Sequence, residues 1–305
     1  MLIYILKRLG LALLVALAVS MIAFGLLRLS GDPAIAIAGE GATQADIAMV
    51  RKTYGFDRPL PVQYAEWLGR TVRGDMGESI YFKTPAAPLI LAKLQTTLVL
   101  GMLSLVFALV ISVPLGVLAA MYRNSWIDRV CLALAVVGQA LPNFFFALLL
   151  IMLFAISLRW LPVSGSDSWQ NFVMPTIALG YYAAPAFMRL IRAGMIEVLD
   201  ADYIRTARAK GLPAGTVIFK HALRNAVVPV VALTAVQLGY LLGGSVVIET
   251  IFALDGLGYL AYQSITYKDF PVMQSIVLLL SVIYVVLTLA SDVANAWLDP
   301  RIRVA

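Results

Sequence analysis

The residues best suited to chemistry are basic and lie close together, between two long apolar runs. They are Arg189, Arg192, Arg205, Arg208, Lys210, Lys220 and Arg224. A segment this charged is not stable in lipid, so it must face water. Its stretch Asp202–Gly211 also carries small residues, which suit close docking by another protein. The chemistry expected here is ionic contact with a partner. A plainer interpretation stays open, namely a basic loop whose arginines snorkel to the membrane surface.

Signatures of catalysis are missing from the chain. It contains no Gly-x-x-x-x-Gly-Lys-[Ser/Thr] sequence and no Gly-Lys dipeptide, so it holds no P-loop nucleotide site. His221 is the only histidine, which excludes a His-rich metal site, and Gly-x-Ser-x-Gly is absent. We therefore predict no catalytic residues, no metal site and no cofactor in this chain.

The composition is that of a membrane protein. Of 305 residues, 61% are hydrophobic and 13% are charged, against about 25% charged in soluble domains. A helix needs roughly 20 apolar residues to cross the bilayer. Six uncharged segments meet or nearly meet this length: Leu9–Leu27, Leu94–Tyr122, Val130–Leu158, Ser168–Met188, Asn225–Ile248 and Phe270–Ser291. We predict an all-α membrane protein with about six transmembrane helices, because no segment alternates like a barrel strand.

The net charge of +6 follows from this topology. With the N-terminus inside, the cytoplasmic side holds more than half of the Lys and Arg, including Lys7, Arg8, Arg301 and Arg303. The long first loop escapes the positive-inside rule. We therefore predict cytoplasmic N- and C-termini, contact with a lipid bilayer, and no nucleic-acid partner.

The N-terminal third divides into a first span and an external cap. Residues 1–29 are predicted as a transmembrane helix that Gly31-Asp32-Pro33 ends. A cleaved signal peptide is the alternative, but the apolar core is longer than such peptides carry. Residues 30–93 are predicted as the cap, with helices at Gln44–Tyr54 and Gln63–Val72 and a turn at Arg73–Ser79.

Residues 94–300 are predicted as the transmembrane core. Pro142 should kink the third span, and the amides of Gln139 and Asn143 beside it could line an aqueous path. Gly239-x-x-x-Gly243-Gly244 allows close helix packing, or a weak point that acts as a gate. The candidates for a translocation path are Gln139, Asn143, Gln237, Gly243 and Gly244. Ordinary packing is the alternative for each.

The cytoplasmic loop 193–226 is predicted to form two helices. Asp200 or Asp202 can cap the first, and Gly211-Leu-Pro213 should end it. A second helix, Ala214–Asn225, should lead into the fifth span. The pair would lie on the membrane and be shaped to enter a groove.

This loop resembles the coupling loop of the integral membrane subunits of ABC importers, in the dipeptide/oligopeptide (peptide/nickel) branch. The matching stretches are Asp202-Tyr-Ile-Arg-Thr-Ala-Arg-Ala-Lys-Gly211, His221-Ala-Leu-Arg-Asn-Ala226 and Pro229-Val230. Further landmarks are Gly31-Asp-Pro33, Gly74-Asp-Met-Gly77, Leu161-Pro-Val-Ser164, Glu249-Thr-Ile-Phe252, Gly256-Leu-Gly258, Asp269-Phe-Pro271 and Asp299-Pro-Arg301. The chain departs at Leu254-Asp255, where the family often has Trp-Pro.

The resemblance implies a permease subunit of an ATP-driven importer in a bacterial inner membrane. Its partners would be a homologous second permease subunit, two cytoplasmic ATPases that bind ATP and Mg, and a periplasmic or extracellular solute-binding protein. Closure of the ATPases would drive alternating access. The residues that match the coupling loop, or lie within it, are Asp202, Arg205, Ala207, Arg208, Lys210, Gly211, His221 and Arg224.

Three functions stay open at this point. The resemblance places di-, tri- or oligopeptides first, including glutathione. A nickel importer shares the same architecture. A passive channel or ion-coupled carrier belongs to a different class, and would transport without an ATPase.

Overall fold

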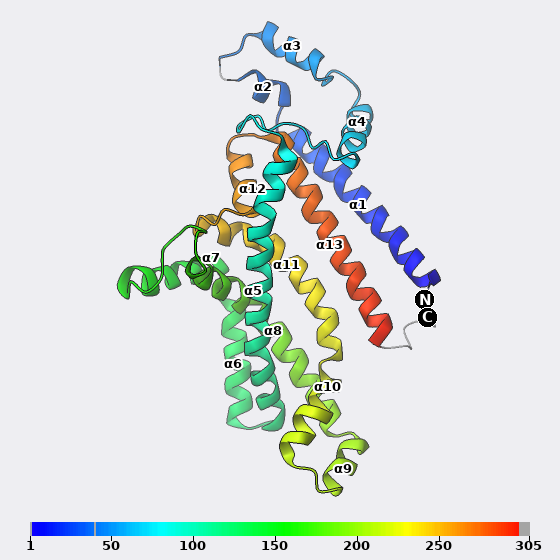
Figure 1. Cartoon of the computed structure of the whole chain (residues 1–305), viewed down its shortest axis with the longest axis vertical. Coiled ribbons are helices and arrows are strands. Elements are labelled where there is room, and N and C mark those ends of the chain that lie inside the picture. Colours follow the sequence, from blue (N-terminus) through cyan, green and yellow to red (C-terminus); the bar gives the residue numbers. More distant parts are fainter. Residues whose placement is uncertain (1, 40, 299–305) are drawn as a thin grey trace.

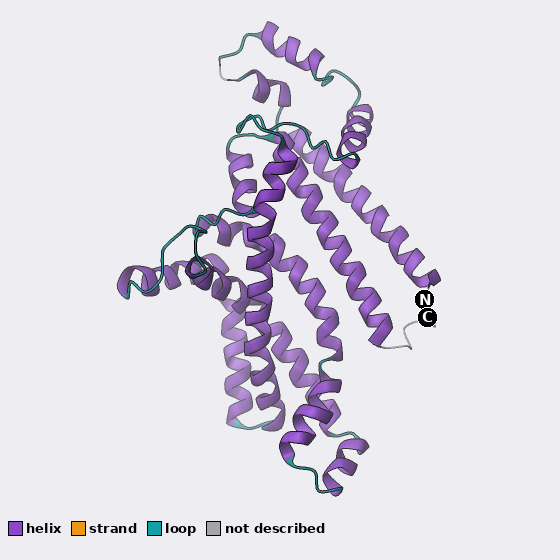
Figure 2. Cartoon of the chain, viewed as in Figure 1, coloured by secondary structure: helices purple, strands orange, loops and turns teal. Residues whose placement is uncertain are grey.

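The computed structural model describes residues 2–39 and 41–298, which form helices joined by turns (Figures 1 and 2). The long helices are α1 (Leu2–Ser30), α5 (Ala86–Met121), α8 (Gln170–Leu199), α11 (Val228–Ile251) and α13 (Phe270–Leu298). The shorter ones in the bundle are α6 (Trp126–Ala140), α7 (Asn143–Leu150), the wide helix η1 (Ile151–Ser157) and α12 (Leu257–Thr266). The all-α prediction is confirmed.

Four helices are long and apolar enough to cross a membrane. They contain Leu6–Leu29, Ala86–Met121, Val228–Ile251 and Phe270–Ala294. A fifth crossing results if α6 and α7–η1 form one bent span. The sixth predicted span, Ser168–Met188, lies in α8, which does not meet the same hydropathy criterion in the described chain. The prediction of six spans therefore stays a prediction.

Helix α8 is the centre of the bundle and packs most extensively against α5. Small residues bring the two backbones together, because a Cβ added at Gly180 would lie 2.5 Å from the carbonyl oxygen of Ser104. One at Gly116 would meet Ile191 at 2.9 Å. Since protein rather than lipid covers much of α8, this helix can be less apolar than the others and still lie at membrane depth.

The break predicted at Pro142 is present. Helices α6 and α7 meet at an angle of 99°, and Leu141 between them has an extended backbone. The hydroxyl of Tyr181 on α8 donates to the Leu141 carbonyl at 2.7 Å. A carbonyl at the end of the interrupted helix therefore has a partner, as a buried backbone group requires.

The cap comprises α2 (Pro33–Ala38), α3 (Gln44–Thr53) and α4 (Leu60–Val72). The sequence predicted α3 and α4, but it missed α2. Asp32 caps α2 by accepting from the Ala34 amide at 2.9 Å, and it also pairs with Arg51. Partial burial raises the pKa of Asp32, but these hydrogen bonds outweigh burial, so the pKa lies below its usual range. Helix α5 begins at Ala86, inside the range 30–93 assigned to the cap.

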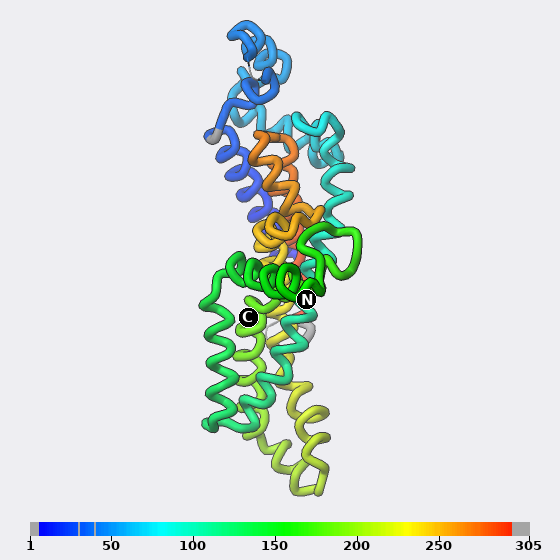
Figure 3. Tube along the Cα trace, turned by 90° about the vertical axis from the view of Figure 1, so that its left-hand side faces the viewer, coloured from blue at the N-terminus to red at the C-terminus, as the bar shows by residue number. Residues whose placement is uncertain are grey.

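The cap and the basic loop lie at opposite ends of an elongated molecule (Figures 1 and 3). Helices α1 and α13 pack against each other and run away from the cap, toward the end that carries α9 (Asp202–Ala209). The start of α1 and the end of α13 are neighbours (Figure 1). Asp299-Pro-Arg301 and Arg303 lie outside the described residues.

Glu249 fastens α12 to α11 and α5. Its side chain is fully buried and accepts from the Thr97 hydroxyl at 2.8 Å and from the amides of Gly258 and Tyr259 at 2.7 and 3.1 Å. A Cβ at Gly256 would collide with this carboxylate. The contact explains both the glutamate and the Gly256-Leu-Gly258 sequence, which the sequence marked only as landmarks.

Candidate coupling surface and translocation path

The basic loop folds into a compact tip at the end of the bundle. It comprises α9, the wide helix η2 (Thr216–Ala222) and α10 (Leu223–Ala226). Ile204, Ala207, Val217 and Ala222 are buried in the same core as residues of α5 and α8. The tip is therefore packed onto the bundle, and a force on it can reach the spans.

Gly194 sets the contact between α8 and the second part of the tip. A Cβ added there would lie 2.8 Å from the Ala226 carbonyl oxygen. The two backbones touch, so α10 has little freedom to slide on α8. The sequence carried no signal for this position.

The turn between the two parts of the tip depends on Gly211. Its φ is +75°, a left-handed conformation that favours glycine. The glycine stop predicted at this position is confirmed. The predicted cap is wrong, because Ala201 occupies the N-cap position without a side-chain hydrogen bond. Asp202 instead lies in the first turn, where its charge complements the helix dipole.

The outward face of the tip mixes basic and apolar side chains. Its exposed members are Asp202, Tyr203, Arg205, Arg208, Lys210, Leu212, Phe219, Lys220 and Arg224. Phe219 is 65% exposed, which is unusual for a phenylalanine. Arg205 approaches Asp202 at 3.3 Å, but both are largely exposed, so this ion pair adds little stability.

Two of the predicted coupling residues are less accessible than this face. Ala207 is buried with Ile204 and holds α9 against the core. His221 is half-buried, and its carbonyl accepts from Asn225 Nδ2 at 3.3 Å. The same Nδ2 donates to the Tyr203 hydroxyl at 2.8 Å. These residues therefore shape the tip from within.

Arg189 and Arg192 belong to α8 and are separate from the tip. Arg192 makes a bidentate pair with the buried Asp128 of α6, with both N–O distances 2.7 Å. Asp128 also accepts from the Asn124 amide at 3.0 Å. The sequence listed Arg192 with the basic residues but gave no indication of its partner.

The path candidates are divided between two environments. At the α6–α7 break, Gln139 accepts from Arg189 at 3.1 Å, and Asn143 Oδ1 is buried without a hydrogen-bond partner in the described chain. Gln237 is half-buried on α11. Gly244 faces α8, with Leu179 3.9 Å from an added Cβ.

Gly243 faces the other way. It lines a cavity of about 310 Å³ with Val15 of α1 and Leu280 of α13. One turn earlier, a Cβ at Gly239 would lie 2.5 Å from the Tyr284 ring. The glycine spacing thus serves close packing of α11 on α13 at Gly239, and Gly243 lies apart from the polar candidates.

Family models match the chain over nearly its full length. The model described as "Binding-protein-dependent transport system inner membrane component" matches residues 112–304. The model of the N-terminal part of such membrane components matches residues 1–114. The chain belongs to this family. It is a permease subunit of an ABC importer.

Curated relatives of this permease have similar sequences along their entire length. The glutathione transport system permease protein GsiC of Salmonella choleraesuis (strain SC-B67) is 41% identical, over 99% of both chains. GsiC of Escherichia coli (strain K12) is 40% identical, again over 99% of both. Among solved structures, the inward-facing MetNI methionine ABC transporter matches with a TM-score of 0.59 and 22% identity. That match covers 69% of the permease and 96% of the other chain, and it shows the fold.

The family explains the division of labour seen in the sequence. A membrane component of an ABC importer works with an ATPase and a binding protein, so the permease itself needs no nucleotide site. The tip is the part of the described structure that combines exposed charge, exposed apolar side chains and a firm attachment to the core. It is the best candidate for the contact with the ATPase.

Proposed function

We propose that this permease moves di-, tri- or oligopeptides, glutathione among them, inward across a bacterial inner membrane by alternating access. The observation that carries the proposal is the 41% identity over 99% of both chains with a protein named as a glutathione transport permease. The complex would contain a homologous second permease, two cytoplasmic ATPases that bind ATP and Mg, and an external solute-binding protein.

The tip is proposed as the element that transmits ATPase closure to the spans. Its exposed cations, Arg205, Arg208, Lys210 and Arg224, would pair with acids on the ATPase, and Phe219 would enter an apolar part of the groove. A conformational change follows only if the partner binds the two states of the permease with different affinity. The buried Ile204 and Ala207 would carry that difference into α5 and α8.

The path is proposed to pass the α6–α7 break. The unpartnered Asn143 Oδ1 supports this assignment, because a buried polar atom without a partner is rare away from functional sites. Gln139 and Gln237 would contribute further amides, and Gly244 would keep α11 close to α8. We do not extend the proposal to Gly243, since it faces α1 and α13.

Uptake by the reconstituted complex tests the proposal. Proteoliposomes would contain the permease with its partner subunits, and the binding protein would be added on the cap side. We expect uptake of radiolabelled glutathione or trialanine that needs ATP on the tip side. Uptake by the permease alone would support a channel or carrier instead, and accumulation of nickel without peptide would support the nickel alternative.

A further inference from the structure

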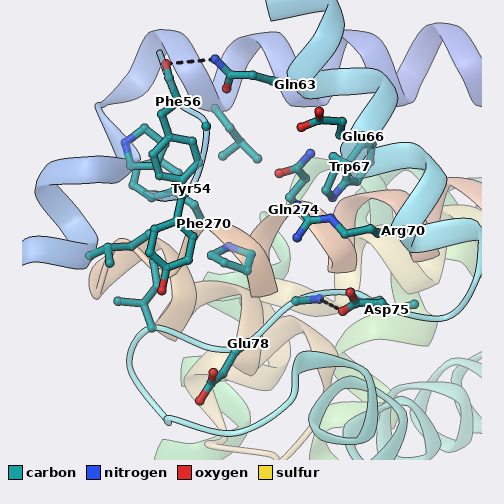
Figure 4. Close-up of a pocket in the computed structure, with 18 of the residues that line it drawn as sticks. Tyr54, Phe56, Gln63, Glu66, Trp67, Arg70, Asp75, Glu78, Phe270 and Gln274 are labelled. Atoms are coloured by element: carbon teal, nitrogen blue, oxygen red, sulfur yellow. Dashed lines mark hydrogen bonds between the residues drawn. The ribbon is translucent and has the colours of Figure 1, made fainter. Parts of the chain in front are cut away.

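A cavity of about 760 Å³ lies under the cap, between α4, the segment 73–83 and the start of α13 (Figure 4). It lies at the opposite end of the molecule from the tip and apart from the α6–α7 break. Sites for small molecules commonly measure about 300–1,000 Å³, so a short peptide fits by volume.

Two buried amides in the cavity wall have unsatisfied atoms. Gln63 of α4 and Gln274 of α13 are only 9% and 8% exposed, and both line the cavity. Gln63 Nε2 donates to the carbonyls of Phe56 and Arg58 at 3.1 and 2.8 Å, which fixes the amide orientation. Its Oε1 is left without a partner among the described residues, and so is Gln274 Nε2. The wall therefore offers both an acceptor and a donor.

The charges around the cavity favour a carboxylate. Arg70 projects from α4 into the space beside Gln274 (Figure 4), and Arg73 and Lys83 also line it. Among the lining acids, Asp75 accepts from the Gly77 amide at 2.9 Å. A guanidinium suits bidentate contact with a carboxylate. Lining acids such as Glu78 could receive an ammonium group.

Aromatic side chains form the remaining wall. The rings of Tyr54 and Phe56 are stacked with centroids 5.8 Å apart. Trp67 and Phe270 line the cavity from α4 and α13. A cavity with apolar walls and a few convergent polar groups is the usual form of a ligand site.

The floor of the cavity is fixed to the transmembrane core. Asp269, fully buried before α13, accepts from the Ser79 hydroxyl and from the amides of Ile80 and Tyr81 at 3.1 and 3.4 Å. The ring of Tyr81 also stacks on Tyr267 at 3.8 Å. The segment 73–83 is thus held against α13, so the cavity is a built feature of the fold.

We propose that this cavity binds a short peptide, through one backbone amide and the C-terminal carboxylate, before the peptide enters the membrane. A peptide group supplies an N–H for Gln63 Oε1 and a carbonyl for Gln274 Nε2. A free carboxylate or phosphate supplies acceptors only and leaves Gln63 unmatched. The carboxylate pairs with Arg70. The inference rests on the proposed function and adds a peptide site on the permease itself.

Direct binding tests the inference without the solute-binding protein. The probe is radiolabelled trialanine, added to the whole complex of permeases and ATPases in lipid nanodiscs. We expect saturable binding that trialanine amide, which lacks the carboxylate, competes about tenfold less well, because an ion pair with hydrogen bonds is lost. Acetate and inorganic phosphate should not compete at the same concentration.

Three variants locate the site. Gln274→Met keeps the side chain's size, and Arg70→Gln removes the charge; each should weaken trialanine binding about tenfold or more. Lys52→Gln is the matched control, because Lys52 is an exposed cap residue outside the cavity lining, and it should leave binding unchanged. Gln274→Met should not lower the melting temperature, since it removes an unpartnered buried amide.

Peptide uptake, measured in parallel with the solute-binding protein present, separates the two proposals. If wild-type complex transports peptide but shows no saturable binding, or if both variants bind as wild type, the inference is overturned and the proposed function stands. Loss of binding protein capture by a photo-crosslinker at Ile80 when trialanine is added supports the site. Capture that trialanine does not affect makes the cavity a protein-docking surface and overturns the inference.

Discussion

At Gly211 the backbone turns with a φ of +75°, and a Cβ added there would meet nothing within 4 Å. Any effect of substitution must therefore come from backbone strain, which is about 1–2 kcal/mol for an L-residue in this conformation. Asparagine tolerates it better than other residues, and a β-branched residue tolerates it least. The pair Gly211→Val and Gly211→Asn separates the turn's shape from its composition.

We expect Gly211→Val to raise the number of ATP molecules hydrolysed per peptide transported several-fold, because the tip would no longer hold its shape in the groove. Gly211→Asn should stay near the wild-type ratio. Hydrolysis and uptake measured on the same proteoliposomes give the ratio. Equal ratios for both variants would mean that the turn does not couple the two processes.

Glu249 is a second position at which one side chain holds several elements. Glu249→Ala would leave the Thr97 hydroxyl and two amides of α12 without an acceptor, at about 1–3 kcal/mol for each buried group. We expect a clear fall in the melting temperature of the purified permease complex. Glu249→Gln keeps one acceptor oxygen and should fall less. An unchanged melting temperature for Glu249→Ala would show that water replaces the carboxylate.

The ion pair between α6 and α8 acts at the scale of elements. Asp128 is buried, and its partner Arg192 is 22% exposed at the side chain. Asp128→Asn leaves a largely buried guanidinium without its counter-charge, which should destabilise the complex by about 3 kcal/mol. The double variant Asp128→Leu with Arg192→Met should recover most of this loss, because no charge is left unpaired. Thermal melts of the four proteins form the cycle, and additive losses would contradict the pairing.

The sequence predicted those elements that have a local signal. The end of α1, the helices α3 and α4, the break at Pro142 and the turn at Gly211 all follow from prolines, glycines and periodicity. Helix α2 was missed because six residues carry too little pattern. The central position of α8 was missed because a helix buried on most sides loses its contrast between faces.

Long-range contacts could not be read from the chain. Arg192 and Asp128 are 64 residues apart, and each has several possible partners of opposite charge. The cavity under the cap joins Gln63 to Gln274, which come from separate helices. The sequence marked the neighbourhood of both through Gln63–Val72 and Asp269-Phe-Pro271, but only the fold shows that they enclose a space.

For the whole molecule, the structure separates the cap from the tip, and the permease should present them on opposite sides of the membrane. In a Cys131→Ala background, Lys52→Cys should react with a membrane-impermeant maleimide applied to spheroplasts. Arg208→Cys should react only after lysis. Labelling of both positions in intact spheroplasts would contradict the assigned orientation.

Co-purification of an ATPase tests the central claim most directly, that this permease is driven through its tip. The tagged permease would be extracted gently from its own membranes and assayed for vanadate-sensitive hydrolysis, which the chain cannot perform itself. We expect hydrolysis with the wild type and its loss in the variant Arg205→Gln/Arg208→Gln/Lys210→Gln, while Lys52→Gln retains it. A permease that purifies intact and alone under several mild detergents, or a triple variant that keeps full activity, would contradict the account.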